Sequence, residues 1–481
     1  MSRTLKSSCN AAAVLLILCA IPAAVSNAAS LGSVRGTVLD SHNSAIKNAT
    51  VSLQSMTSGY IIKTVTGESG EFSFRAVPIG DYQIFVEATG FRTDETSLRV
   101  TSENVTTFNA VLEVGAVSEK VTVTGEAGQV AAAPPTSTNL VSRGQIEQTP
   151  GADRTNSLSL ITDYVPGAYM THDQLHVRGG HQVSWLIDGV PVPNTNIASN
   201  VGPQFDPKDV DYLEVQTGGY SAEFGDRAYG VLNVLPRTGF ERDREAELVL
   251  SFGNFLQTND QFSFGDHNEK MAYYVSLNGN RSDFGLATPT ADVLHDRQSG
   301  FGGFGSFVYL PSDKDQLRLV ASARSDHYQI PNDQGAQLAG IDDVENESDA
   351  FLNFSWIRTI GKDLLLTVSP FYHFNRADFI GGPNDVPLSP QERRDSHYAG
   401  GQVTIGALTK KHDFRAGVYS FFQHDSSFFG IKANDGSGTN LQQQETINGG
   451  IEAAFLEDQF KALKWLTLTG GLRLTHFGGA I

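Results

Sequence analysis

Hydrophobic and polar residues alternate with a period of two along most of the chain. Between residues 33 and 114 the alternating stretches are short, as in Glu71-Phe72-Ser73-Phe74, and turn residues separate them. Alternation of this kind places the apolar side chains on one face of a strand. About seven such strands fit into this region, and the economical way to pack them is a two-sheet β-sandwich.

Longer alternating stretches return after residue 244. Apolar residues share one face at Leu317 and Leu319, Leu366 and Val368, Phe414 and Ala416, and Leu466 and Leu468. Stretches of about ten residues with one apolar and one polar face are typical of transmembrane β-barrel strands. A soluble sandwich gives a similar alternation, so the pattern alone predicts about eleven antiparallel strands in residues 244–481 and leaves both folds open. In a membrane barrel, the polar stretches 326–348 and 379–396 are expected as extracellular loops.

The segment between these two regions is rich in turn motifs. The run Leu175-His176-Val177-Arg178-Gly179-Gly180 precedes a second apolar run, 183–192, in which Asp188-Gly189 is a tight hairpin signal. Two further runs, 210–215 and 218–225, complete the set. We expect this segment, residues 136–240, to fold as an α+β domain.

Composition and charge narrow the classes of function. The chain has 481 residues, 35 Lys+Arg against 53 Asp+Glu, and a formal net charge of −18. Nucleic acid is not expected as a partner, because phosphate binding needs a basic surface.

Arg3 and Lys6, followed by an apolar run, predict an export signal over residues 1–28. Its cleavage removes both cysteines, Cys9 and Cys19, so the exported chain folds without disulfides.

The sequence offers no chemistry typical of an active site. We find no nucleophile, acid–base pair, phosphate loop or zinc spacing, and we expect neither an enzyme nor a cofactor. His172, His176 and His181 lie close together in the sequence, but His172 and His176 are four residues apart on an expected strand. Asp173 is the only nearby carboxylate, which does not complete a metal site.

The first region has the pattern of a known module. Its residues are Gly36, Gly70-Glu71-Phe72, residues 78–82 and Gly90-Phe91. This pattern resembles the carboxypeptidase regulatory-like domains, which implies a β-sandwich of carbohydrate-binding-like fold over residues 31–115. Such modules carry no catalytic residues. The sequence leaves open whether this one is a structural or docking module or binds a ligand such as a carbohydrate.

The motifs of the middle segment, taken in order, resemble the plug domain of TonB-dependent outer-membrane receptors. Residues 456–460 and 468–473 also resemble barrel motifs of this family. The plug-motif residues are Arg178, Gly179, Gly180, Asp188, Gly189, Glu214, Gly218 and Arg227. The resemblance implies that Arg178, Glu214 and Arg227 make charged contacts in a polar lumen. Thr217 stands where many members have arginine, which favours the Oar-like branch and argues against a siderophore as solute.

Residues 116–135 link the two domains and carry one further motif. Their residues Glu119, Lys120, Val121, Thr122, Val123 and Thr124 resemble a TonB box, the segment that a TonB-type periplasmic energy-coupling protein binds. A β-branched stretch beside a flexible linker can add as a strand to another protein's sheet edge. The same residues also fit an ordinary last strand of the sandwich, and the sequence leaves both interpretations open.

Together these resemblances imply a mostly β chain with an N-terminal β-sandwich, an α+β plug and a partial antiparallel transmembrane β-barrel. The implied location is the outer membrane, surrounded by lipid, with the N-terminal domain in the periplasm. The implied function is to bind an unknown extracellular solute and import it by periplasmic energy coupling. The alternative is a non-transporting envelope or adhesion protein that uses the sandwich for binding.

The expected number of strands is small for a plugged barrel. Plugged transporters have about 22 strands, and about eleven strands do not enclose a domain of this size. We therefore expect a chain that represents the N-terminal part of such a receptor. An open half-barrel leaves two unpaired strand edges, which lipid does not tolerate, so we expect this chain not to insert stably by itself.

Overall fold

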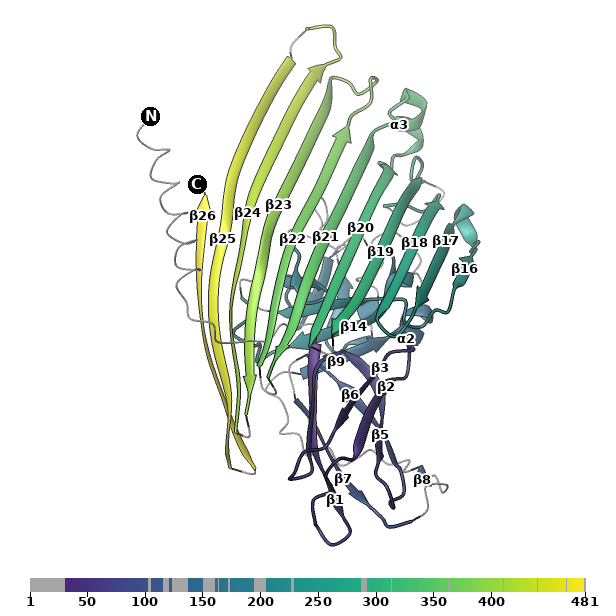
Figure 1. The fold of residues 1–481 in the computed structure, drawn as a ribbon. Coiled ribbons are helices and arrows are strands. Elements are labelled where there is room, and N and C mark those ends of the chain that lie inside the picture. The colour runs from purple at the N-terminus through teal and green to yellow at the C-terminus, as the bar shows by residue number, and fades with distance from the viewer. Residues whose placement is uncertain are drawn as a thin grey trace.

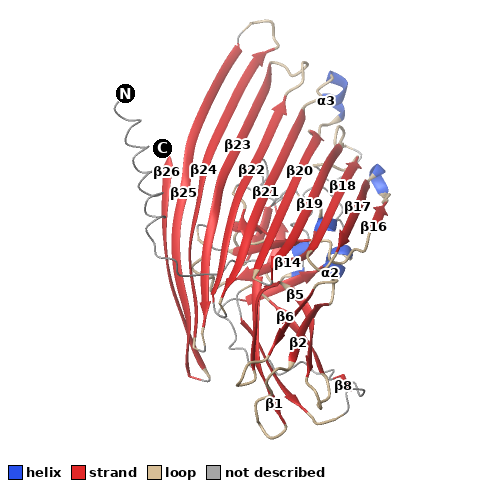
Figure 2. Cartoon of the chain, in the orientation of Figure 1, coloured by secondary structure: helices blue, strands red, loops and turns tan. Residues whose placement is uncertain are grey.

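A computed structural model describes residues 31–102, 105–115, 121–122, 137–149, 161–162, 164–171, 174–193, 205–225, 229–286, 292–312, 314–361, 364–409, 411–438, 440–463 and 465–479. A small β-sandwich lies at one end, a wide curved sheet rises from it, and a middle domain lies against the inner side of that sheet (Figure 1). Strands dominate all three parts, and the helices are short (Figure 2). The predicted export signal, residues 1–28, lies outside the described residues.

The N-terminal part is a two-sheet β-sandwich, as the short alternating stretches predicted. One sheet has the order β4-β1-β7 and the other β3-β2-β5-β6-β8. The strands are β1 (Leu31–Asp40), β2 (Thr50–Ser55), β3 (Ile61–Val65), β4 (Glu71–Pro78), β5 (Gly80–Glu87), β6 (Asp94–Val100), β7 (Val105–Leu112) and β8 (Val121–Thr122). The apolar positions of the alternation, among them Phe72, Phe74 and Ile84, form the core between the two sheets.

One glycine of the module pattern has a clear steric role. Strands β1 and β7 run parallel, with Gly36 opposite Phe108. A Cβ atom on Gly36 would lie 1.5 Å from the carbonyl oxygen of Phe108. Only a residue without a side chain therefore fits at this point of β1.

The middle domain has a five-stranded sheet of order β13-β12-β15-β14-β9. Its elements are β9 (Ser137–Ser142), α2 (Arg143–Glu147), β10 (Ala168–Thr171), β11 (Gln174–Val177), β12 (Val183–Ile187), β13 (Val190–Pro191), η2 (Pro207–Asp209), β14 (Val210–Thr217) and β15 (Gly230–Pro236). All residues of β14 and β15 are buried. In β14, Leu213 and Val215 point into the apolar core, whereas Tyr212 and Glu214 contact residues of the sandwich.

The large sheet consists of eleven strands in sequence order, all antiparallel to their neighbours, within the described residues. They are β16 (Glu245–Val249), β17 (Thr258–His267), β18 (Met271–Ser282), β19 (Gln298–Ser312), β20 (Asp315–Gln329), β21 (Val344–Ile360), β22 (Leu364–Ile380), β23 (Leu388–Leu408), β24 (His412–Ala433), β25 (Asn440–Leu463) and β26 (Leu466–Gly479), with η3 (Asn254–Leu256) and α3 (Gln334–Ala339) between strands. The predicted alternation is confirmed: in β18, Val275 and Leu277 are exposed on the outside, whereas Ser276 and Asn278 are buried on the inside.

The inner wall of the large sheet departs from the polar pattern where it meets the middle domain. Phe304, Phe351 and Phe371 are buried there and belong to the same apolar core as the strands of the middle domain. Phe205 of the middle domain packs edge-on against Phe304, with ring centroids 4.9 Å apart. These three inward-facing aromatic side chains therefore pack against the middle domain and do not line a water-filled interior.

About half of the residues in the two polar stretches expected as loops lie in strands, so this expectation is wrong in its extent. The connection after β20 covers only residues 330–343, and the connection after β22 only residues 381–387. Polar residues do not end these strands because cross-strand ion pairs hold them together. Arg393 lies opposite Asp378 and their side chains are 2.9 Å apart.

No helix in the part of the chain that the structure describes is long and apolar enough to cross a membrane.

Candidate functional site

One buried polar site lies where the sandwich, the middle domain and the large sheet meet. Glu214 of β14 is fully buried. The backbone N–H of Ser102 donates to its Oε1 at 3.0 Å, and the Ser102 hydroxyl donates to its Oε2 at 2.7 Å. Arg415 of β24 donates from Nη2 to the carbonyl oxygen of Ser102 at 3.2 Å. One residue of the sandwich thus binds both other parts of the chain.

Glu214 differs from the expectation of a charged contact in the lumen. Its hydrogen-bond donors include neutral groups of Ser102, the Asn233 side chain and, at 3.5 Å, the Gln216 amide. Burial raises the pKa of Glu214, and the donors from Ser102 oppose that rise. The motif singled out Glu214, but no local pattern pointed to Ser102, which lies 112 residues away in the sequence.

The Asp188-Gly189 pair forms the tight turn between β12 and β13 that the sequence predicted. Both residues have a positive φ, 52° and 79°, and the Gly189 N–H donates to Oδ1 of Asn233 at 2.9 Å. The turn also makes an ion pair that the sequence did not indicate. Asp188 Oδ1 lies 2.7 Å from Nη2 of Arg318 in β20, and the side chains are 0% and 6% exposed.

The arginine–glycine motif forms a second turn, directly after β11. Val177 and Gly180 exchange backbone hydrogen bonds of 2.8 and 3.1 Å around Arg178 and Gly179, which both have a positive φ. The Arg178 guanidinium lies against Gly218, where a Cβ atom would be 2.4 Å from Nη1. Two parts of the motif that are 40 residues apart are therefore in contact. Arg227 lies outside the described residues.

The TonB-box-like segment is described only at Val121 and Thr122, because Glu119, Lys120, Val123 and Thr124 lie outside the described residues. Val121 and Thr122 form the short edge strand β8, which pairs in parallel with Asp94 and Glu95 of β6. This is the placement expected of a last strand of the sandwich. It does not test whether a coupling protein binds the segment.

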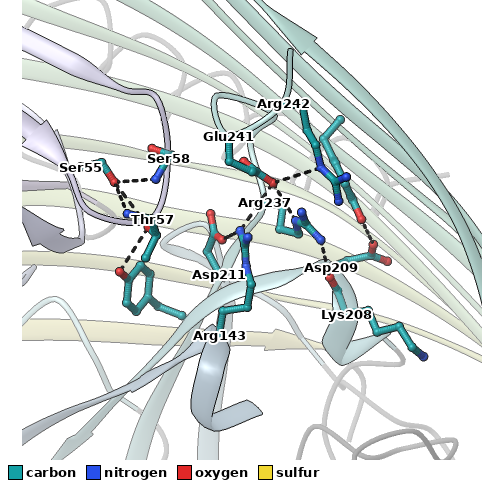
Figure 3. Close-up of polar contacts among 12 residues, drawn as sticks. Ser55, Thr57, Ser58, Arg143, Lys208, Asp209, Asp211, Arg237, Glu241 and Arg242 are labelled. Carbon is teal, nitrogen blue, oxygen red and sulfur yellow. Dashed lines mark hydrogen bonds and ion pairs between the residues drawn. The ribbon is translucent and has the colours of Figure 1, made fainter. Parts of the chain in front are cut away.

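An ion-pair cluster surrounds the chain where it passes from the middle domain into the large sheet (Figure 3). Arg143 of α2 contacts Asp211 and lies 3.5 Å from Glu241, and Nε of Arg237 lies 2.7 Å from the same glutamate. Arg242 binds Glu247 of β16. The cluster ties α2, β14 and the connection to β16 together, and nothing in the local sequence pattern predicted it.

Asp209 fixes the same corner of the middle domain to the large sheet. Gln261 of β17 and the hydroxyl of Tyr274 in β18 each donate to its Oδ1 at 3.1 Å. Burial, together with the nearby charge of Asp206, raises the pKa of Asp209 to about 7. The carboxyl therefore remains partly protonated near neutral pH.

A cavity of about 600 Å³ lies between the middle domain and the inner wall of β23–β26. Trp185 and Pro193 form its wall on the side of the middle domain. The opposite wall contributes Arg394, Tyr398, Gln402, Phe421, Gln423 and Asp425. Aromatic faces beside amide and charged groups suit the binding of a polar organic molecule by stacking and hydrogen bonds.

Glu223 forms part of the wall of this cavity and joins the middle domain to β23. Gln402 Nε2 donates to Glu223 Oε1 at 2.6 Å, and the guanidinium of Arg473 donates to the Glu223 carbonyl oxygen. Next to it, the Ala222 N–H donates to Glu457 of the run 456–460 at 2.7 Å. Burial raises the pKa of Glu223 to about 7, opposed by the charge of Arg415 and the hydrogen bond from Gln402.

Two of the three motif histidines, His176 and His181, make aromatic contacts. His176 stacks on Tyr169 at a centroid distance of 5.3 Å and meets His181 edge-on at 5.5 Å. His172 lies outside the described residues. Within the described ranges, no three histidine, cysteine or acidic residues form a group that could hold a metal ion.

Two family models match the chain. Residues 33–113 match the carboxypeptidase regulatory-like domain, and residues 131–232 match the TonB-dependent receptor plug domain. The chain therefore carries a carboxypeptidase regulatory-like sandwich followed by a TonB-dependent receptor plug, which we call the plug from here on. No curated protein sequence matches the chain significantly.

Solved receptors share the fold at low sequence identity. The ferric yersiniabactin uptake receptor FyuA from Yersinia pestis matches with a TM-score of 0.56 and 13% identity, over 71% of this chain and 57% of that one. The ferric citrate transporter FecA matches with a TM-score of 0.54 and 13% identity, over 71% and 56%. The copper transporter OprC matches with a TM-score of 0.55 and 16% identity, over 72% and 55%.

These matches identify the large sheet as the fold of a TonB-dependent receptor barrel, and we call it the barrel sheet. The chain spans between half and two thirds of the length of these receptors. The predicted fold class of sandwich, plug and antiparallel barrel strands is thereby confirmed.

Proposed function

We propose that the chain functions as a TonB-dependent outer-membrane receptor, which binds an extracellular solute above the plug and releases it on the side of the sandwich. The observation that carries this proposal is the plug itself. It is a separate domain on the inner face of strands whose outer face is apolar, and it is held there by polar contacts such as Asp188–Arg318. Aromatic contacts such as Phe205–Phe304 add to these polar contacts, so release of the plug requires that both kinds of contact be broken.

The arrangement of the strand connections supports an orientation in the membrane. At the end near the sandwich, neighbouring strands are joined by short turns, such as the connection between β19 and β20. At the far end the strands are longer and the connections larger. Barrels of the outer membrane have short turns on the periplasmic side and long loops outside, so the sandwich lies in the periplasm.

The cavity beside Trp185 is the proposed solute site. Its volume of about 600 Å³ lies in the range of small-molecule sites. The related structures include a ferric yersiniabactin uptake receptor, a ferric citrate transporter and a copper transporter. For this chain we propose a polar organic solute, because charged and amide side chains such as Arg394, Gln423 and Asp425 line the cavity beside apolar residues.

The TonB-box-like segment, residues 119–124, is the proposed attachment point of the energy-coupling protein. Strand addition needs a free backbone N–H, and proline has none. Val121→Pro is therefore expected to weaken binding of a purified TonB-type periplasmic domain by at least about tenfold. Val121→Thr keeps the N–H and the β-branched shape and serves as the matched control.

The measurement is a binding titration on the purified full chain in detergent micelles. Weak binding by Val121→Pro with near-normal binding by Val121→Thr supports the assignment of the segment. Equal binding by both variants, or no binding by the unmodified chain, excludes it. In a cell that expresses the receptor, the same Pro variant is expected to lose solute uptake.

A further inference from the structure

Ser102 occupies an unusual position for a residue of an N-terminal module. It lies just beyond the end of β6 and is only 5% exposed. Through two hydrogen bonds to Glu214 it holds the plug, and through its carbonyl oxygen it holds Arg415 of the barrel sheet. Removing the hydrogen-bond donors of a buried carboxylate costs more free energy than removing those of an exposed one. The reason is that water does not readily take the place of the lost donors at a buried site.

Other contacts hold the sandwich on the same two partners. The Asp81 N–H donates to the hydroxyl of Tyr212 in the plug at 3.4 Å. Arg35 donates from Nη1 to the carbonyl oxygen of Thr409, between β23 and β24, at 2.9 Å. The Gly59 N–H donates to the carbonyl oxygen of Phe240 at 2.8 Å. The sandwich is therefore docked on the plug and on the barrel sheet at once.

The strand that leads to Ser102 is also the strand that holds the TonB-box-like segment. In β6, Asp94 and Glu95 pair with Val121 and Thr122 of β8, and β6 ends at Val100, two residues before Ser102. Because β6 is also paired with β5 from Asp94 to Val100, a pull on β8 reaches the Glu214 contact through the β5–β6 pair rather than through β6 alone.

The chain on the other side of β8 leads to the same plug strand. After residues 123–136 the chain enters β9, which pairs with β14 in a register that sets Leu140 opposite Glu214. The segment on which the coupling protein acts is thus bracketed by two attachments to β14. One is the backbone pairing of β9, and the other is the side-chain contact of Ser102 with Glu214.

We propose that the sandwich is a clamp that keeps the plug closed, with Ser102 as its contact, and that removal of β8 from β6 releases Ser102 from Glu214. This step rests on the proposed function, since it assigns the pull to the coupling protein. In this proposal, the sandwich is not only a spacer between the receptor and its coupling protein, because it also holds the plug closed. Under the same proposal, β14 can move only after the sandwich has separated from it.

The test compares hydrogen exchange of the full chain in detergent micelles for three variants. Ser102→Ala removes the hydroxyl donor to Glu214. Ser102→Thr keeps a hydroxyl at the same position and tests for rescue. Ser97→Ala is the matched control, because Ser97 lies exposed on the same strand β6. The readout is the exchange rate of backbone amides in β14, followed by mass spectrometry of peptides that cover residues 210–217.

A hydrogen bond to a charged group is strong enough that its loss should speed the opening of β14 about tenfold in Ser102→Ala. Ser97→Ala and Ser102→Thr are expected to stay within about twofold of the unmodified chain. If Ser102→Ala exchanges at the unmodified rate, the clamp is excluded, whatever the coupling protein does.

Addition of the purified TonB-type periplasmic domain separates this proposal from the proposed function. The release step predicts that the added domain speeds exchange in β6 and β14 together in the unmodified chain. Binding that leaves the exchange of both strands unchanged overturns the release step but not the proposed function. If the added domain binds neither Val121→Pro nor the unmodified chain, the assignment of residues 119–124 to coupling is wrong. The Ser102→Ala result still decides whether the clamp exists.

Discussion

Asp188 of the plug and Arg318 of β20 form a buried ion pair, with Oδ1 and Nη2 2.7 Å apart and side chains that are 0% and 6% exposed. Asp188 sits with a positive φ in the turn between β12 and β13. Removing one partner of a buried pair leaves the other charge uncompensated. That loss is usually far larger than the loss of a surface pair.

We therefore expect Asp188→Ala to lower the free energy of plug unfolding by about 3–5 kcal/mol. The measurement is hydrogen exchange of peptides that cover β12 and β13 in the full chain. The control is Asp283→Ala, whose partner Arg297 is 3.3 Å away but whose pair is about half exposed. It is expected to cost less than about 1 kcal/mol. Similar losses in the two variants would contradict the role of burial.

Glu223 predicts a dependence of plug stability on pH. Burial raises its pKa from the ordinary value of 4.5 to about 7. The folded chain therefore keeps a proton between these two values that the unfolded chain gives up. The stabilisation is complete below about pH 4.5 and is lost as the pH rises through about 7, with an upper limit of about 3 kcal/mol.

Glu223→Gln is expected to flatten this part of the pH profile, because its amide does not titrate. The readout is the free energy of plug opening from hydrogen exchange between pH 5 and 8, after correction for intrinsic exchange. Asp209, with a pKa of about 7, leaves a residual slope of the same sign. An unchanged slope in Glu223→Gln would show that Glu223 does not carry the effect.

Gly36 predicts a steric limit in the sandwich. A methyl group at this position would lie 1.5 Å from the Phe108 carbonyl oxygen, so β1 and β7 would have to separate. We expect Gly36→Ala to destabilise the sandwich by about 3 kcal/mol or more. Gly144→Ala is the control, since an added Cβ there meets nothing within 4 Å. Protection of β7 amides against exchange measures both, and a tolerated Gly36→Ala would refute the close approach.

Tyr212 tests the docking of the sandwich separately from Ser102. Its hydroxyl accepts from the Asp81 N–H at 3.4 Å and donates to Thr57 Oγ1 at 3.3 Å. Tyr212→Phe keeps the ring and removes both bonds, so we expect docking to weaken by about 1 kcal/mol. The change should appear as faster exchange in β5 of the full chain. Tyr229→Phe, at an exposed tyrosine, should leave β5 unchanged.

The sequence predicts best what depends on neighbours along the chain. Alternation at Phe72 and Phe74, or at Val275 and Leu277, identifies strands and their buried face because each depends on one local period. The same holds for the turn at Asp188-Gly189. The fold class followed from these local patterns and from motif order.

The same local patterns could not predict contacts between distant segments. Ser102 with Glu214 and Asp188 with Arg318 join residues more than 100 positions apart. Whether an acidic residue finds a cation or a serine there depends on how the three parts dock. The extent of the loops was misjudged for a different reason, since pairs such as Arg393–Asp378 keep polar strands paired.

The length of the last strands has a consequence for what reaches the receptor from outside. Strand β25 has 24 residues, which at about 3.4 Å per residue gives about 80 Å. Even at a tilt near 45° it rises well past a hydrocarbon layer of about 30 Å. In the proposed orientation, strands β23 to β25 extend above the membrane as a continuous antiparallel sheet. A molecule that approaches this part of the protein from outside would therefore meet regular, hydrogen-bonded strands before it reaches the cavity.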